Sequence, residues 1–113
     1  MQAVFIEMPV FENYRAKYLS DDEYLELQNV LLKAPRKGDL IQGAGGLRKI
    51  RWADSNRGKG KPGGTRIIYY YFAGGPQFWL FTIYAKDEAV DLTQEQKKTL
   101  KKMLDKEVAA RSQ

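Results

Sequence analysis

The strongest apolar pattern of the chain lies in two runs separated by a short turn. The runs Thr65–Phe72 and 77–86 are rich in β-branched and aromatic residues, and each is apolar on both faces for part of its length. This composition is typical of central strands. The sequence AGGP at 73–76 between them favours a tight turn. We therefore predict a hairpin of two buried strands at the centre of a sheet.

Two shorter segments have strand patterns of their own. The sequence AVFIEM at 3–8 ends before Pro9 and predicts a first strand. At 47–53, the alternation of a strand places Lys49 and Arg51 together on one face. Two glycine-rich segments flank this strand and are predicted to be loops, the second of them a mobile hairpin loop: 38–46 and 54–64.

Helical spacing of apolar residues predicts three helices. The first covers 9–19, the second follows a capping box that begins at Ser20 and stops at Pro35, and the third follows a similar pattern at Thr93. The order is strand, two helices, three-strand meander and C-terminal helix. It predicts one α+β domain over residues 1–113, with an antiparallel sheet and the helices on one face. The other face would then be free for function.

Composition removes several classes of chemistry. A chain of 113 residues fits a single domain, and it contains neither cysteine nor histidine. Disulfides, thiolate nucleophiles, thiolate zinc sites and histidine-based triads are therefore excluded, and no cofactor is expected. A hard-cation site made of carboxylates alone stays formally possible. The N-terminal sequence does not resemble a signal peptide, and no apolar run is long enough for a membrane span, so we expect a cytoplasmic protein without a membrane partner.

The net charge of +5 is concentrated in one part of the chain. Residues 47–66 carry +6, so the remaining residues sum to −1. A basic charge collected in one segment predicts a surface for an anionic partner. The cations of this segment are Arg48, Lys49, Arg51, Arg57, Lys59, Lys61 and Arg66.

Several of these cations are predicted to meet. If the strand at 47–53 pairs with Thr65–Phe72, Arg66 lies near Arg51 on the face that carries Lys49, and together they can clamp a phosphate. The alternative is a solvated edge with scattered cations. The loop cations Arg57, Lys59 and Lys61 suit backbone contact with a large polyanion, or an ordinary surface loop; the P-loop pattern is not matched.

Two tyrosines and a lysine extend the candidate surface. Tyr70 has the same strand parity as Arg66 and is a candidate for base stacking. Tyr84 and Lys86 share one face near the end of the last strand. Lys86 is either a functional cation or a structural lysine paired with Glu88.

These segments together resemble the RelE/HigB superfamily of bacterial type II toxins, closest to the HigB branch. The resemblance runs from VFIE at 4–7 to the last helix. It is carried by GGLRKIR at 45–51, GKGKPGGTRIIYY at 58–70, and LFTIYAK at 80–86 followed by Glu88 and the Asp91–Leu92 pair. It implies a RelE-like fold and a small metal-independent endoribonuclease that cuts messenger RNA in the ribosomal A site. It also implies a cognate antitoxin as partner and operator DNA binding only through the antitoxin complex.

The resemblance also suggests site residues. Lys49 and Arg51 match the paired basic residues of the family's second strand, Arg66 matches the arginine near the start of the third strand, and Lys86 matches the basic residue after the last. We expect Lys49 to act as base or electrostatic activator, Arg51 and Arg66 to clamp the phosphate, and Lys86 to stabilise the transition state or the leaving oxygen. No residue is carried over from the family for deprotonating the 2′-hydroxyl. RNA contacts are expected from Arg48, Arg57, Lys59, Lys61, Tyr70 and Tyr84. The alternative function is a non-catalytic RNA- or ribosome-binding module.

Overall fold

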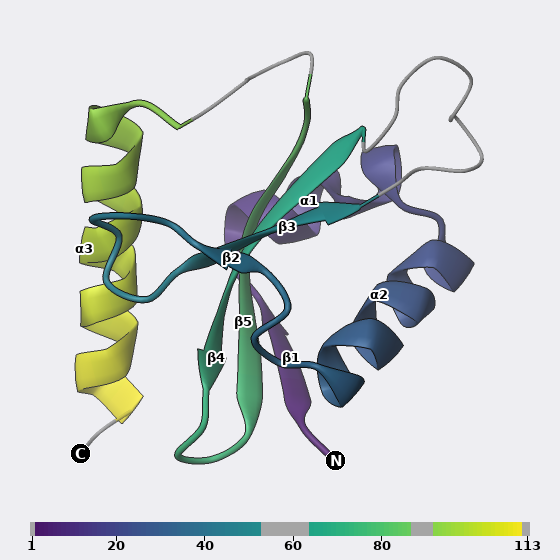
Figure 1. Ribbon diagram of the computed structural model, residues 1–113, viewed down its shortest axis with the longest axis horizontal. Coiled ribbons are helices and arrows are strands. Elements are labelled where there is room, and N and C mark those ends of the chain that lie inside the picture. Colours follow the sequence, from purple (N-terminus) through teal and green to yellow (C-terminus); the bar gives the residue numbers. More distant parts are fainter. Residues whose placement is uncertain (1, 53–63, 87–91, 112–113) are drawn as a thin grey trace.

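A single five-stranded sheet organises the protein, with helices on both of its sides (Figure 1). The structure is a computed structural model that describes residues 2–52, 64–86 and 92–111. The strand order across the sheet is β1-β5-β4-β3-β2. In chain order the elements are β1 (Val4–Glu7), α1 (Pro9–Tyr18), α2 (Asp21–Lys33), β2 (Asp39–Leu40), β3 (Arg48–Trp52), β4 (Thr65–Phe72), β5 (Gln77–Ala85) and α3 (Gln94–Arg111).

The predicted meander is confirmed. β3, β4 and β5 pair antiparallel in sequence order, and β4 covers the predicted residues. A register shift in the β4–β5 pairing places Tyr69 opposite Leu80 and Ile68 opposite Thr82, so Phe81 is an extra residue of β5. The α+β class and the order of the predicted elements are also confirmed.

The strand pairing differs from a purely antiparallel sheet in one place. β1 pairs parallel with β5, with Val4 opposite Gln77 and Glu7 opposite Leu80. The two helices and three strands between β1 and β5 form the long connection that a parallel pair needs. The opposite edge is β2, a two-residue strand inside the segment predicted to be a loop. Two residues are too few to show an alternating pattern, which explains why the sequence did not indicate it.

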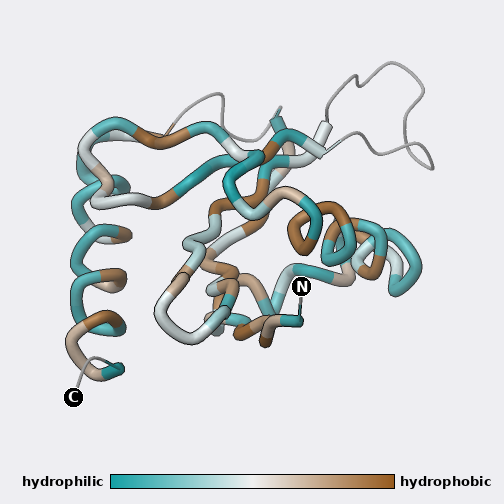
Figure 2. The backbone as a smooth tube through the Cα atoms, turned by 60° about the horizontal axis from the view of Figure 1, so that its bottom comes forward, coloured by the Kyte–Doolittle hydropathy of each residue, from teal (hydrophilic) through white to brown (hydrophobic). Residues whose placement is uncertain are grey.

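The prediction that the helices share one face is wrong. α1 and α2 pack on one face over a core that contains Phe11, Leu27 and Ile67. α3 packs on the other face, where Leu100 and Leu104 meet a second core. In Figure 2 the hydrophobic positions of α3 lie on the side of the helix that faces the sheet. The physical reason is the composition of β4 and β5, because strands that are apolar on both faces need cover on both.

The predicted helix starts are confirmed for α2 and α3. The Ser20 hydroxyl accepts a hydrogen bond from the Glu23 amide at 3.1 Å, while the Glu23 carboxylate accepts from the Ser20 amide at 2.9 Å. Thr93 and Gln96 form the same reciprocal pair before α3. These bonds satisfy amides that a helix leaves without intrahelical partners, so they fix where each helix begins.

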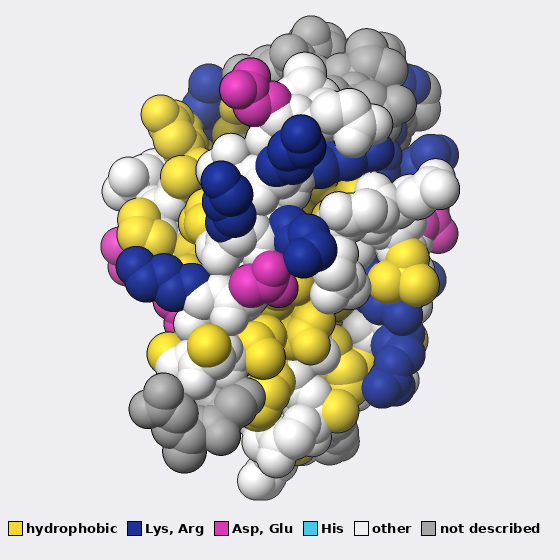
Figure 3. Space-filling view, turned by 90° about the vertical axis from the view of Figure 1, so that its left-hand side faces the viewer, with side chains coloured by type: hydrophobic (Ala, Val, Ile, Leu, Met, Phe, Trp, Pro, Cys, Tyr) yellow, Lys and Arg dark blue, Asp and Glu magenta, His cyan; other side chains and the backbone are white. Residues whose placement is uncertain are grey.

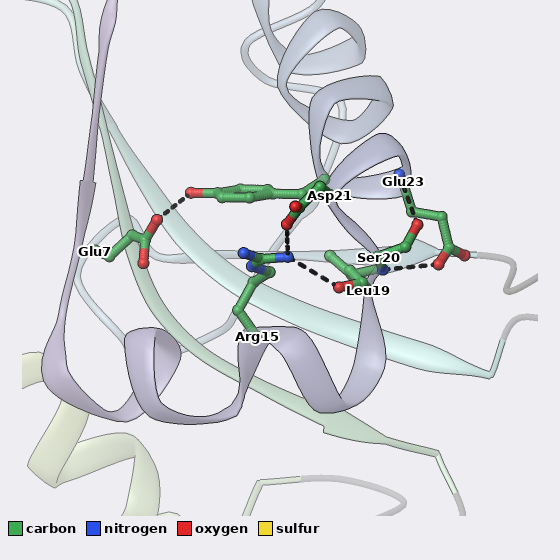
Figure 4. Close-up of polar contacts among 7 residues, drawn as sticks. Glu7, Arg15, Leu19, Ser20, Asp21 and Glu23 are labelled. Atoms are coloured by element: carbon green, nitrogen blue, oxygen red, sulfur yellow. Dashed lines mark hydrogen bonds and ion pairs between the residues drawn. The ribbon is translucent and has the colours of Figure 1, made fainter.

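A polar network joins the first three elements (Figure 4). The Tyr24 hydroxyl of α2 donates to Glu7 of β1 at 2.8 Å, and Arg15 of α1 donates to Asp21 and to the Leu19 carbonyl. The Arg15 guanidinium also lies over the Tyr24 ring at 5.1 Å. Burial raises the pKa of Tyr24, and the hydrogen bond to Glu7 adds to this effect. The network attaches the edge strand and both helices to each other on the face away from α3.

Candidate functional site

Two arginines and a tyrosine form a row across the three central strands. Arg51 of β3 lies directly opposite Arg66 of β4, and Arg66 lies directly opposite Tyr84 of β5. Residues directly opposite in an antiparallel pair project from the same face, with Cβ atoms about 5 Å apart. Ile50, Trp52 and Ile67 pack in the core beneath α1 and α2, so the row projects from the α3 face. The sequence-based expectation that Arg66 lies near Arg51 is thereby confirmed.

The centre of this row is a buried cation. Arg66 is only 7% exposed, and its Nη1 atom donates a long hydrogen bond of 3.4 Å to the Thr65 carbonyl. Like charges directly opposite in a sheet are destabilising. An anion that binds beside Arg51 and Arg66 would reduce the repulsion between these two paired cations.

Lys49 lies on the same face of β3, two residues before Arg51. It lies opposite Asp39 of β2 on one side and Ile68 of β4 on the other. Two residues along a strand correspond to about 7 Å, so Lys49 and Arg51 can contact neighbouring groups of one ligand. The structure thus brings together three of the four predicted catalytic residues.

Lys86, the fourth, directly follows β5 and lies two residues beyond Tyr84. It is exposed, and its backbone amide donates to the Gly64 carbonyl at 2.8 Å, which extends the β4–β5 ladder by one step. Its alternation with Tyr84 directs the side chain to the α3 face. The alternative partner, Glu88, lies outside the described residues, as do Arg57, Lys59 and Lys61.

Arg48 and Tyr70 make intramolecular contacts that the sequence did not indicate. Arg48 projects from the opposite face and donates to the carbonyls of Arg36 and Gly38, at 3.2 and 2.8 Å. It therefore secures the chain between α2 and β2 and lies apart from the cation row. Tyr70 does lie on the α3 face, but it is half-buried against Trp79, with a ring-centroid distance of 5.2 Å. It packs at the edge of the second core.

A small hollow lies beside the cation row and includes residues that the sequence did not single out. Its volume is about 210 Å³, and its lining consists of Asp39, Leu40, Ile41, Gln42, Lys49, Arg51, Leu92 and Lys97. Lys97 comes from the first turn of α3 and Asp39 from β2. Both residues were missed because the hollow exists only when α3 packs against the face that was expected to be uncovered.

The electrostatics of this side of the molecule are dominated by cations. Lys and Arg side chains outnumber acidic ones in the view from the side of α3 (Figure 3). In the described part of the chain no three acidic residues lie close enough together to hold a metal ion. None of the described helices has the length and apolar character needed to cross a membrane.

The architecture defines a class: a small α+β protein in which a meander is flanked by two N-terminal helices and one C-terminal helix. Solved structures of the E. coli toxin RelE share it. The free state of a RelE variant with two arginine-to-alanine substitutions matches with a TM-score of 0.53 and 17% identity, over 80% of this chain and 90% of that one. The same variant in complex with an antitoxin RelBc peptide matches with a TM-score of 0.50 and 14% identity, over 83% and 98%. No family model matches the sequence. The chain therefore has the RelE-like fold, as the sequence resemblance implied.

Proposed function

We propose that this protein is the toxin of a type II toxin–antitoxin system and acts as a ribosome-dependent endoribonuclease that cleaves messenger RNA in the A site. The observation that carries the proposal is the cross-strand pair of Arg51 and Arg66, flanked by Lys49 and Tyr84 on one sheet face. The RelE-like fold supports the same function. The basic pair offers forked donors that match phosphate oxygens.

The chemistry needs no metal ion. The 2′-hydroxyl of a nucleotide attacks the adjacent phosphorus, its proton leaves, and the bond from phosphorus to the 5′-oxygen of the next nucleotide breaks. Negative charge grows on the phosphate oxygens during this step. Arg51 and Arg66 are fixed on paired strands before the reaction, so they stabilise this charge without reorganising. Lys49 adds electrostatic activation, and Lys86 stabilises the leaving 5′-oxygen.

The remaining RNA contacts extend along the same face. Tyr84 continues the row on β5, and we assign a further RNA contact to Tyr70, whose ring lies beside Gly46 on the same face. Arg57, Lys59 and Lys61 come between β3 and β4 in the sequence, and we assign them to the RNA backbone. The ribosome would supply the alignment of the message that this small surface lacks.

The proposed partners follow from the function. They are the ribosome with its message, and a cognate antitoxin protein that blocks the toxin; operator DNA would be bound only through the toxin–antitoxin complex. The solved complex of RelE with an antitoxin peptide is an example of such a partner on the same fold. The protein would act in the cytoplasm, where translating ribosomes are found.

The test is expression of the protein alone and together with the small gene beside its own. We expect growth arrest that the neighbouring gene relieves, and primer extension on a translated message that stops at discrete sites within codons. A non-catalytic RNA-binding module would slow growth without such stops, and its RNA affinity would fall steadily with salt. Intact transcripts during growth arrest would contradict the proposed cleavage.

A further inference from the structure

The hollow beside the arginine pair has a mixed lining that phosphate binding alone does not explain. Three cations, Lys49, Arg51 and Lys97, line it together with one acidic residue, Asp39. At about 210 Å³ it is smaller than the sites that hold whole small-molecule ligands, and it has room for part of one nucleotide. A carboxylate repels phosphate, so its presence among the cations indicates a second task.

The position of Asp39 is fixed by the sheet. β2 pairs antiparallel with β3, and Asp39 lies directly opposite Lys49. The carboxylate therefore projects from the face that carries Arg51 and Arg66. Asp39 is exposed, which leaves it accessible to a ligand that enters the hollow.

The residue before Asp39 is held from beneath by the opposite face. The Gly38 amide donates to the Tyr69 hydroxyl at 3.0 Å, and the Gly38 carbonyl accepts from Arg48 at 2.8 Å. The Tyr69 hydroxyl in turn donates to the Pro35 carbonyl at 2.8 Å. A two-residue strand is weak by itself, so these bonds are what hold the backbone of Asp39 in a defined place.

We infer that Asp39 is the group that accepts the proton of the attacking 2′-hydroxyl, an inference that rests on the proposed function. In the step, the 2′-oxygen forms a bond to phosphorus as its proton passes to the Asp39 carboxylate. The bond from phosphorus to the 5′-oxygen breaks, its electron pair stays on that oxygen, and the oxygen takes a proton from a water molecule. The hydroxide that remains takes the proton from Asp39 and restores its carboxylate. The products are a 2′,3′-cyclic phosphate and a 5′-hydroxyl.

The chemistry of the lining favours Asp39 over its neighbours in this role. A carboxylate oxygen accepts hydrogen bonds and protons, whereas ammonium and guanidinium groups are donors only. Lys49, Arg51 and Lys97 are then left to hold the phosphate and to stabilise its growing charge. The groups that face Asp39 within the hollow are those three cations and Gln42, while Arg48 and Tyr69 lie behind its strand.

The test is the Asp39→Asn variant, measured as single-turnover cleavage of a message in the A site of purified ribosomes. At pH 7 we expect kcat to fall about 10² to 10⁴-fold, the range for loss of a general base. In the variant hydroxide must remove the proton, so its rate should rise about tenfold per pH unit, more steeply than the rate of the wild type.

A binding measurement separates catalysis from structure. The dissociation constant for ribosomes that carry a message with a 2′-deoxy nucleotide at the cleavage position should be unchanged or lower for Asp39→Asn, since a repulsive charge is removed. Asp22→Asn, an exposed aspartate of α2 away from the hollow, is the matched control and should cleave as the wild type does.

Each result has a defined meaning. A variant that cleaves within about threefold of the wild type, or loses activity only through KM, or keeps the wild-type pH profile overturns the role of Asp39. If the wild type itself does not cleave, the proposed nuclease function has failed, and that outcome is distinct from failure of this inference alone.

Discussion

The same strands form both faces of the sheet, but the two faces differ in how far helices cover them and in the charges that they carry. On the face beneath α1 and α2, two helices close over buried residues such as Phe11, Leu27 and Tyr69. On the other face α3 covers one part, and the row from Arg51 to Tyr84 and the hollow beside it occupy another. We call the face beneath α1 and α2 the closed face. Both faces bury an apolar core, whereas the surface suited to an anion lies where the α3 face also carries cations. Mutations should separate the two properties.

Among the substitutions that compare the two faces, the largest effect is expected for Arg66, the buried cation of the row. Arg66→Met keeps most of the side-chain volume and removes the charge, so we expect cleavage to fall about 10² to 10³-fold, as for loss of a fixed charge-stabilising donor. The folded state should be retained, because a like-charge contact with Arg51 is also removed. Single-turnover cleavage and a urea melt measure the two effects.

Arg36 provides the control for that substitution. It is an exposed arginine on the closed face, where its guanidinium lies over the Tyr71 ring at 5.2 Å. Arg36→Met should leave cleavage within about twofold of the wild type. Equal losses in the two variants would show that net charge, and not position in the row, governs activity.

The closed face should show the converse result. Leu27 is fully buried between α2 and the sheet, so Leu27→Ala should lower the free energy of unfolding by about 2 to 5 kcal/mol. Leu25 is 56% exposed on the same helix, and Leu25→Ala should change the free energy of unfolding by less than about 0.5 kcal/mol. Urea unfolding of both variants measures the difference, and similar values would contradict a core on this face.

Arg48 is a cation on the closed face, and its substitution tests whether it contributes to stability or to RNA binding. Its guanidinium donates to two backbone carbonyls, so Arg48→Met should lower the free energy of unfolding by about 1 to 3 kcal/mol. If Arg48 acts only in this way, RNA affinity at low temperature should stay within about twofold of the wild type. A clear loss of affinity with unchanged stability would support the RNA contact expected from the sequence.

The smallest effect concerns alkaline pH. Burial raises the pKa of Tyr24 and of Tyr69, so the folded state keeps these protons to higher pH than the unfolded chain does. Their contribution to stability is complete below about pH 10, the ordinary tyrosine pKa, and declines as the pH rises above it. The slope should be at most about 1.4 kcal/mol per pH unit for each tyrosine. Tyr24→Phe should flatten the decline in urea melts between about pH 9 and 11; an unchanged slope would contradict it.

The sequence predicted the elements well because each carries a local signal. The capping boxes at Ser20 and Thr93 mark helix starts, and the apolar runs of β4 and β5 mark central strands. Those same runs also contained the information that the sheet needs cover on both sides. The expectation of helices on one face overlooked it, so the place of α3 was wrong.

The candidate site was predictable only where neighbours in space are fixed by a hairpin. Arg51 and Arg66 meet because the meander pairs β3 with β4, and their register follows from that pairing. Asp39 and Lys97 reach the hollow through a two-residue edge strand and through helix packing, and neither leaves a periodic pattern in the sequence. Arg48 was assigned to RNA from its charge, whereas its hydrogen bonds depend on how the chain turns between α2 and β2.

Cleavage of a labelled message on purified ribosomes, with the wild type and Arg66→Met compared in one gel, tests the central claim most directly. The account predicts discrete cuts in the A-site codon for the wild type and almost none for the folded variant. Full-length message with both proteins, or equal cutting by both, would contradict it.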